Sequence, residues 1–275
     1  MQPPGIGGRF PCAVPIEDSQ ERQPMKMLEG KVALVTGGGQ GVGQGIALAL
    51  AAEGARVAVA GRTIATLEQT CAQIAQRGGT GLAVTCDVTD PADIERCVAQ
   101  VVDAFGGLNI LVNNAQIIPL GRILEVTDED FSKGLDSGPM AAVRLMRACY
   151  PHLKGDGAVV NLASSAAVRW DASGYGHYAA TKEAIRALSR GAACEWGPDG
   201  IRVNVIAPLA LSPGLRGWMD AYPDEAAAFV HSIPLGRVGD CENDIGRTVA
   251  FLVSDQARYL TGATIPLDGG QAHWG

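Results

Sequence analysis

Aromatic and charged side chains are both scarce in this sequence of 275 residues, at 5% and 19%. Together with 47% hydrophobic residues, this excludes the disordered, highly charged class and favours a soluble domain packed from aliphatic side chains. Basic residues are also the minority, because 22 Lys and Arg against 29 Asp and Glu give a formal charge of −7. The general electrostatic footprint of a nucleic-acid-binding protein is therefore missing, although a local basic pocket for one phosphate is compatible with this charge.

Long apolar runs and paired cysteines are missing too. No window approaches the roughly 20 consecutive apolar residues of a membrane span. Residues 1–27 contain five prolines but no apolar segment of a secretory signal, so we expect a flexible N-terminal extension. The seven cysteines are far apart and include no Cys-x-x-Cys pair, which argues against a disulfide framework and against a zinc site. A cytoplasmic protein without a metal fits these features.

From Lys31 onward, short runs rich in Val, Ile and Ala alternate with longer segments of helical period. This alternation predicts a single α/β domain over 28–275, with parallel strands joined by crossover helices on both faces of the sheet. An irregular segment at about 209–240 is rich in Pro and Gly and is expected to act as a substrate lid. We expect strands at 32–35, 56–59, 82–85, 110–112, 158–161, 202–205 and 264–267, and helices at about 42–53, 63–77, 91–105, 128–153, 176–197 and 242–254.

A glycine-rich turn follows the first predicted strand and precedes an apolar helix. Such a turn lets backbone N–H groups and the positive end of a helix approach a pyrophosphate, but an ordinary tight connection has the same composition. The second strand ends at Gly61-Arg62-Thr63, without the carboxylate that commonly holds the ribose hydroxyls of NAD. Arg62 offers a fork for a 2′-phosphate instead, which favours NADP(H) and leaves NAD(H) open. Asp87 closes the third strand and is a candidate acceptor for the adenine amino group.

Tyr178 and Lys182 stand four residues apart on one face of a predicted helix. A phenol is a poor base at neutral pH, and a neighbouring ammonium is expected to favour its ionised form. Ser164 ends the fifth strand and should lie at the carboxyl edge of the sheet, where open α/β folds bind ligands. Ser165 is the close rival for that role.

These motifs occur in a characteristic order: the glycine turn, Asp87, Asn113-Asn114-Ala115, Ser164, Tyr178-x-x-x-Lys182 and Asp268-Gly269-Gly270. The sequence over about 28–275 resembles the short-chain dehydrogenase/reductase family. That resemblance implies a Rossmann-type fold of seven parallel strands, hydride transfer between a nicotinamide and a carbonyl or alcohol, and a homotetramer or homodimer. It also implies that Tyr178 is the general acid/base, that Lys182 holds the nicotinamide ribose and that Ser164 donates to the substrate oxygen. The implied cofactor-binding residues are Gly37, Gln40, Gly41, Val42, Gly43, Arg62, Asp87, Val88, Asn114, Ala115, Tyr178, Lys182 and Pro208.

The sequence departs from the family pattern near the expected active site. Gly138 stands where the family usually has an Asn that serves a proton relay, and Pro139 after it should kink the helix. We expect the relay to survive through a water held by the carbonyl of Gly138 or Leu135. Gln116 and Leu209 replace common glycines, and Gln116 should either contact substrate or face water.

We therefore expect an NADP(H)-preferring oxidoreductase that interconverts a hydrophobic ketone and a secondary alcohol. A dinucleotide-binding pseudoenzyme or regulatory protein, with a degraded relay at Gly138, is the alternative. An epimerase or dehydratase that uses a bound cofactor is a third possibility. Apolar residues of the surrounding loops are the candidate substrate walls: Ile117, Ile118, Trp170, His177, Trp218, Met219, Tyr222 and Phe229.

Overall fold

Seven parallel strands form the sheet of the computed structural model, which describes residues 26–118, 120–170 and 172–274. Their order across the sheet is β3-β2-β1-β4-β5-β6-β7, which confirms the predicted doubly wound fold. The winding reverses between the neighbours β1 and β4, and an open α/β sheet leaves a ligand crevice at such a point. The strands are β1 (Val32–Thr36), β2 (Arg56–Gly61), β3 (Thr80–Thr85), β4 (Ile110–Asn113), β5 (Gly157–Leu162), β6 (Ile201–Pro208) and β7 (Thr264–Leu267).

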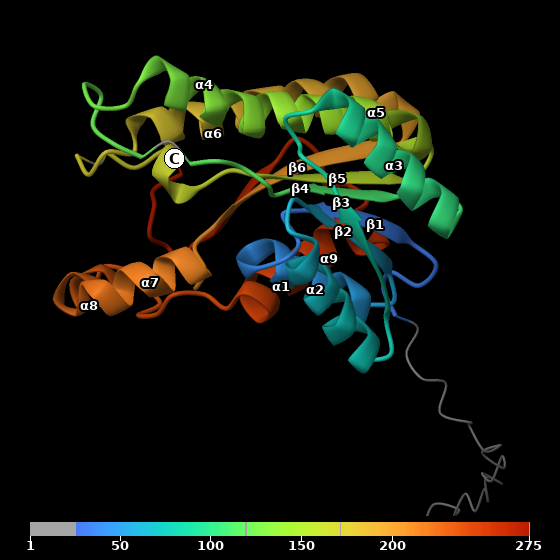
Figure 1. Ribbon diagram of the computed structural model, residues 1–275, viewed down its shortest axis with the longest axis horizontal. Coiled ribbons are helices and arrows are strands. Elements are labelled where there is room, and N and C mark those ends of the chain that lie inside the picture. Colours follow the sequence, from blue (N-terminus) through green and yellow to red (C-terminus); the bar gives the residue numbers. More distant parts are fainter. Residues whose placement is uncertain (1–25, 119, 171, 275) are drawn as a thin grey trace, which may run out of the picture.

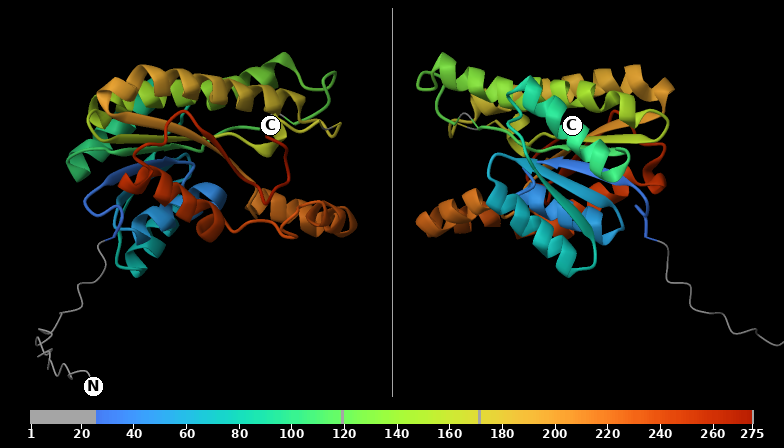
Figure 2. Two further views of the ribbon diagram at one scale, coloured as in Figure 1. Left: turned by 180° about the vertical axis from the view of Figure 1, so that it is seen from behind. Right: turned by 45° about the vertical axis from the view of Figure 1, so that its right-hand side comes forward.

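Helices cover both faces of the sheet, as Figures 1 and 2 show. One layer contains α3 (Pro91–Phe105), α5 (Ala141–Leu153) and α6 (Gly176–Trp196), and the other contains α1 (Gly41–Ala52), α2 (Ile64–Gln76) and α9 (Arg247–Val253). Successive side chains of a strand point to opposite faces, so the uninterrupted apolar runs supply both layers. In β1, Val32 and Leu34 pack into the core under α3 and α5, whereas Ala33 and Val35 pack into the core over α1 and α2.

A π-helical turn interrupts the long helix expected at 128–153. Helix α4 (Asp128–Leu135) runs into a π-helical segment at Asp136–Met140, and α5 follows directly. Pro139 lies inside this segment and cannot donate a backbone hydrogen bond, and the Ala141 N–H donates to the Asp136 carbonyl five residues back. The disturbance expected at Gly138-Pro139 therefore takes the form of a π-helical turn. A second one, Cys241–Gly246, leads into α9.

The segment 209–240 is not irregular, which corrects the sequence prediction. It contains α7 (Pro213–Ala221) and α8 (Pro223–His231), which project from the body of the protein beyond the sheet (Figures 1 and 2). Pro213 and Pro223, two of the three prolines that suggested a loop, occupy the start of a helix, where the missing N–H costs nothing. Ser212 caps α7, because its Oγ accepts a hydrogen bond from Leu215 N at 3.2 Å.

The residues on either side of the boundary expected between 27 and 28 both contact Glu53. Met27 N donates to Glu53 Oε2, and the fully buried Leu28 donates from its N–H to the Glu53 carbonyl at 2.9 Å. The remainder of the predicted N-terminal extension, 1–25, lies outside the described residues. No helix in the described part of the chain has the length and apolarity needed to cross a bilayer.

Candidate active site

A cavity of about 650 Å³ lies at the carboxyl edge of the sheet, between the glycine turn after β1 and the first turns of α6. It is lined by residues that follow β1 to β6, and these residues are far apart in the sequence. Every residue expected to bind the cofactor lines it except Gly43. The lining set is Gly37, Gln40, Gly41, Val42, Arg62, Asp87, Val88, Asn114, Ala115, Tyr178, Lys182 and Pro208.

The glycine turn has the geometry of a phosphate cradle. Gly37 and Gly41 have φ values of +64° and +55°, in the left-handed region that favours glycine. A Cβ on Gly43 would overlap the Gly37 carbonyl oxygen, so Gly43 serves the packing of α1 against the turn instead of lining the cavity. Gln40 makes no side-chain hydrogen bond to the first turn of α1, so the backbone N–H groups there lack a cap. Free donors at the positive end of a helix fit a pyrophosphate.

Polar side chains fasten the glycine turn to the centre of the sheet. Thr36 Oγ1 accepts from Asn114 N at 3.0 Å and from Ala115 N at 3.2 Å, and Asn114 Nδ2 donates to the Thr36 carbonyl at 2.9 Å. Asn113 Nδ2 donates to Asn161 Oδ1 at 2.7 Å and links β4 to β5. The paired asparagines therefore brace neighbouring strands.

Arg62 and Asp87 lie toward the end of the cavity formed by β2 and β3. Arg62 is exposed at the rim and makes no hydrogen bond or ion pair with any other residue that the structure describes. Asp87 Oδ1 accepts from the backbone N and the hydroxyl of Thr89, at 2.9 and 2.8 Å, while its other carboxylate oxygen accepts from no described residue. A free guanidinium and a free carboxylate oxygen therefore remain available to a nucleotide.

The opposite end of the cavity brings Ser164, Tyr178 and Lys182 together. Tyr178 and Lys182 come from the first turns of α6, and the Lys182 Nζ lies 5.5 Å from the centre of the Tyr178 ring. The Ser164 side chain lies beside the Tyr178 hydroxyl and lowers the pKa of the phenol. Lys182 is buried and donates to the Leu162 carbonyl at 2.7 Å, which anchors it to the end of β5.

Burial dominates the ionisation of both groups. It raises the pKa of Tyr178 to about 12, against a smaller lowering by the hydrogen bond from Ser164 and with a further rise from Tyr175. It also lowers the pKa of Lys182 to about 7. The low polarity around both groups thus outweighs the expected effect of the lysine charge on the phenol. At neutral pH Tyr178 keeps its proton and can donate it to an oxygen bound beside it.

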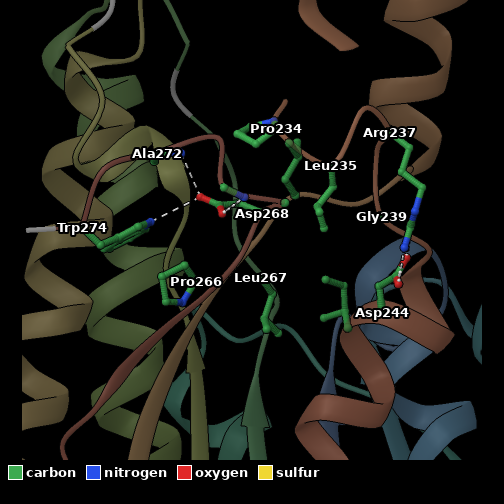
Figure 3. A pocket seen from close by; sticks show the side chains of 14 residues that line it. Pro234, Leu235, Arg237, Gly239, Asp244, Pro266, Leu267, Asp268, Ala272 and Trp274 are labelled. Atoms are coloured by element: carbon green, nitrogen blue, oxygen red, sulfur yellow. Dashed lines mark hydrogen bonds and ion pairs between the residues drawn. The ribbon is translucent and has the colours of Figure 1, made fainter. Parts of the chain in front are cut away.

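Ser165 points to a different partner from its neighbour. Its Oγ donates to the buried Asp268 at 2.7 Å, and Asp268 also accepts from Ala272 N and from Trp274 Nε1 (Figure 3). Burial raises the pKa of Asp268, but the hydrogen bonds from Ser165, Trp274, Gly270 and Ala272 outweigh it and hold the pKa below its usual value. The structure thus brings Ser164, and not Ser165, to the phenol.

Figure 3 shows a second cavity, of about 750 Å³, between β7, the loop at 234–239 and the π-helical segment before α9. Its side chains are mostly apolar, and Leu209 lines both cavities. Its two carboxylates already have partners, because Asp244 pairs with Arg237 and Asp268 holds the C-terminal segment. Neither carboxylate is free for proton transfer, so the first cavity is the candidate active site.

The mouth of the first cavity is apolar. Ile117 and Ile118 line it and are partly exposed. In the projecting arm, the rings of Trp218 and Phe229 meet edge to face, with centroids 5.7 Å apart. His177 is not among the residues that line the cavity, and its ring packs against Phe131 with centroids 4.9 Å apart.

A family model described as enoyl-(acyl carrier protein) reductase matches residues 37–272. The chain belongs to the short-chain dehydrogenase/reductase family. A 12alpha-hydroxysteroid dehydrogenase from Clostridium sp. is 40% identical over 256 residues, which cover 90% of this chain and 98% of the relative. The 2,5-dichloro-2,5-cyclohexadiene-1,4-diol dehydrogenase LinX from Sphingobium indicum is 36% identical over 245 residues, 88% of this chain and 96% of LinX.

Among solved structures, a short-chain dehydrogenase from Burkholderia cenocepacia J2315 in complex with NADP is 34% identical, with a TM-score of 0.83. The match covers 89% of this chain and 99% of that chain. This short-chain dehydrogenase/reductase is therefore an NAD(P)-dependent oxidoreductase that acts on CH–OH or C=O groups of small molecules.

Sequence reasoning did not foresee the partner of one side chain of this short-chain dehydrogenase/reductase. Gln116 lines the cavity but does not face water, because its Oε1 is buried and its Nε2 donates to Thr181 Oγ1 at 2.8 Å. Thr181 itself was missed, although its place inside the Tyr178-x-x-x-Lys182 motif was a signal that it would contact the same site.

Proposed function

We propose that this oxidoreductase interconverts a hydrophobic ketone and a secondary alcohol with NADP(H), and that Tyr178 is the general acid/base. The observation that carries the proposal is the position of Tyr178, which lies beside Ser164 and Lys182 in a cavity that continues to the glycine turn. Both hydroxyls can meet one substrate oxygen there. A hydroxyl aimed at an oxygen that gains negative charge stabilises the transition state most effectively from a site that excludes water.

Each residue then has one role in the reduction. The glycine turn, Asn114 and Lys182 would hold a nicotinamide dinucleotide in the cavity, and its chemistry would be the supply of a hydride to the carbonyl carbon. Tyr178 donates its proton to the carbonyl oxygen, so that the C=O group becomes CH–OH, and Ser164 donates a hydrogen bond to the same oxygen. The Lys182 ammonium, held by the Leu162 carbonyl, has N–H groups left for the ribose hydroxyls.

The preference for NADP(H) rests on Arg62. Its guanidinium is exposed at the rim, has no protein partner in the described part of the chain and can pair with a 2′-phosphate in a bidentate manner. The turn around Arg62 lacks a carboxylate that would bind the two ribose hydroxyls of NAD.

A bulky, largely apolar substrate is supported by the mouth of the cavity. Several large apolar side chains near it are solvent-exposed, and solvent-exposed apolar clusters commonly mark sites of ligand contact. The arm of α7 and α8, which we propose as the lid, adds Trp218 and Phe229. The exposed set on the loops near α6 is Ile117, Ile118, Leu120, Ile123, Leu124 and Trp170. The names of the steroid and cyclohexadienediol dehydrogenases point to cyclic, weakly polar alcohols.

A homotetramer or homodimer through the layer of α4 to α6 is part of the same proposal. Met140 and Leu188 are apolar side chains that remain exposed on these helices, where a second subunit would cover them. Light scattering of the purified protein measures the assembly directly, and a monomer at micromolar concentration would contradict it.

The decisive experiment follows NADPH oxidation with a panel of cyclic apolar ketones, and NADP reduction with the matching alcohols. We expect stoichiometric turnover by the native protein. Tyr178→Phe should lose turnover by roughly a hundredfold or more while its affinity for NADPH, measured by fluorescence titration, stays nearly unchanged. A native protein that binds NADPH but turns over none of these substrates would refute the function.

A further inference from the structure

Gln116 connects β4 to the part of α6 that carries Tyr178 and Lys182. Its Nε2 donates to Thr181 Oγ1 at 2.8 Å, and the Thr181 hydroxyl donates to the Tyr178 carbonyl at 2.8 Å. Thr181 is fully buried and precedes Lys182 directly. The hydrogen-bond network also fixes the orientation of the amide: Thr181 uses its only proton on the Tyr178 carbonyl, so it must accept from Gln116, and Nε2 must face it.

Gly138 provides the space that this side chain occupies. A Cβ added at Gly138 would lie 2.6 Å from Gln116 Nε2 and 2.9 Å from its Cδ, closer than nonbonded atoms approach. Gly138 lies in the π-helical segment, and its neighbour Ser137 holds the same loop by accepting from Ile117 N at 3.0 Å. The carboxamide at 116 and the absence of a side chain at 138 are therefore complementary.

The remaining oxygen of the carboxamide has no partner. Gln116 Oε1 is buried and accepts no hydrogen bond from any residue in the described part of the chain. A buried acceptor that lacks a protein donor commonly holds a water molecule. Lys182 lines the same cavity and uses one of its three ammonium donors on the Leu162 carbonyl. Gln116 Oε1 thus offers an acceptor for a water in the wall of the cavity that Lys182 also lines.

Building on the function proposed above, we propose that Gln116 is a positioning residue of the reaction. Its carboxamide occupies the space over Gly138, fixes the α6 turn that carries Tyr178 and Lys182, and holds a buried water through Oε1. Tyr178 must regain a proton after each reduction, and this reprotonation then depends on the water that Gln116 holds in a fixed place.

The test moves the amide from position 116 to position 138, where Gly138 now leaves space for Gln116. Gln116→Met keeps the volume but removes the amide, and we expect kcat to fall roughly tenfold to a hundredfold, since small misplacements of reacting groups have effects of that size. The KM for NADPH should change little. Gly138→Asn alone should also lower kcat, because its side chain collides with Gln116. The double variant Gln116→Gly/Gly138→Asn returns one amide to the gap and should recover much of the activity that each single change loses.

Gln44→Met is the matched control, because it removes another hydrogen bond from a glutamine to a threonine, Gln44 Nε2 to Thr70 Oγ1 at 3.1 Å, between α1 and α2. It should leave kcat near the native value. Thermal unfolding of every variant separates loss of fold from loss of catalysis, and Gln116→Met keeps the test open if Gln116→Gly does not fold. A solvent deuterium isotope effect on kcat should increase in Gln116→Met, which a purely structural role would not cause.

Two results would overturn the assignment: native kcat and isotope effect in Gln116→Met, or a double variant no more active than the worse single variant. Either result would leave the oxidoreductase activity standing, because the native protein would still turn over. Failure of the native protein itself would count against the proposed function instead.

Discussion

The Ser165 hydroxyl donates a hydrogen bond of 2.7 Å to the carboxylate of Asp268, which lies 103 residues later in the sequence. The same carboxylate oxygen accepts from Ala272 N and Trp274 Nε1, so one buried acid joins the turn after β5 to the segment after β7. Ser164 is the next residue toward the N-terminus and lies beside the Tyr178 hydroxyl. The backbone from which Ser164 reaches the phenol is therefore held in place by a residue outside the cavity that contains the phenol.

Asp268→Asn should destabilise the protein by about 1–3 kcal/mol, because an amide presents N–H groups to donors that need an acceptor. The pKa of Asp268 is held below its usual value, so its stabilising effect is present above the unfolded-state pKa and disappears as the pH falls through the lower folded-state pKa. The difference between native and variant should therefore persist at neutral pH, begin to shrink as the pH falls below about 4, and disappear only below the lower folded-state pKa. Urea unfolding at several pH values measures it, with the exposed Asp255→Asn as a control that should change little.

Lys182→Met should stabilise the cofactor-free protein and abolish turnover. Lys182 is buried, and burial lowers its pKa to about 7. Between that value and an unfolded-state pKa near 10.4, the unfolded chain binds the additional proton, so the native stability should rise with pH over this window. Replacing the buried amine by an apolar chain of similar length should add about 1–3 kcal/mol at pH 7 and flatten this rise. The exposed Lys26→Met is the control, and an equally steep pH dependence in Lys182→Met would contradict the assignment.

Arg62→Asp should reverse the cofactor preference. The carboxylate repels a 2′-phosphate and accepts hydrogen bonds from ribose hydroxyls, so we expect the Kd for NADPH to rise roughly tenfold or more and that for NADH to fall. Isothermal titration with both dinucleotides gives the two constants. Arg258→Asp introduces the same charge change at an exposed position outside the lining of the cavity and should preserve the native ratio. If both substitutions changed the ratio of the two Kd values equally, the cofactor preference would depend on the net charge of the protein and not on Arg62.

Trp218→Ala should loosen the arm formed by α7 and α8, because it removes the edge-to-face contact with Phe229. We expect a KM several-fold higher for a bulky apolar ketone, with a smaller effect on a small ketone that does not reach the arm. Trp218→Phe should retain most of the contact and of the affinity. Steady-state kinetics with one large and one small substrate distinguish the two, and equal changes for both would exclude the arm as the lid.

The strands and the carboxyl edge of the sheet follow from the sequence. A continuous apolar run such as Val32–Thr36 indicates a strand that is buried on both faces, between two layers of helices. The sequence identified the residues that line the cavity for a related reason, since turns after parallel strands converge on one edge. Helices α7 and α8, which both begin with Pro, could not be distinguished from loops in the sequence. Pro is common both at the first position of a helix and in turns, so its presence does not decide between them.

Side-chain direction and polarity were harder to predict. Gln116 stands on a loop, where no periodicity indicates which way it turns, and only the proximity of Gly138 and Thr181 decides that. The choice between Ser164 and Ser165 depends on Asp268, which is more than a hundred residues away. The spacing of Tyr178 and Lys182 predicted that they meet, but the low polarity around them, which raises the pKa of one and lowers that of the other, arises from packing.

Thr36 binds the backbone of residues 78 and 79 positions further along the chain, so the two sides of the nucleotide crevice meet only after β4 has joined β1. Contacts between such distant residues require long loops to close, and the entropy lost in closing them precedes the stabilising contacts, so the chain folds slowly. The dinucleotide has no complete crevice to bind until that step is over, so it acts on the finished fold alone. At a hundred times its Kd it should add about 2.7 kcal/mol to the stability of the native state, without accelerating the steps that precede closure.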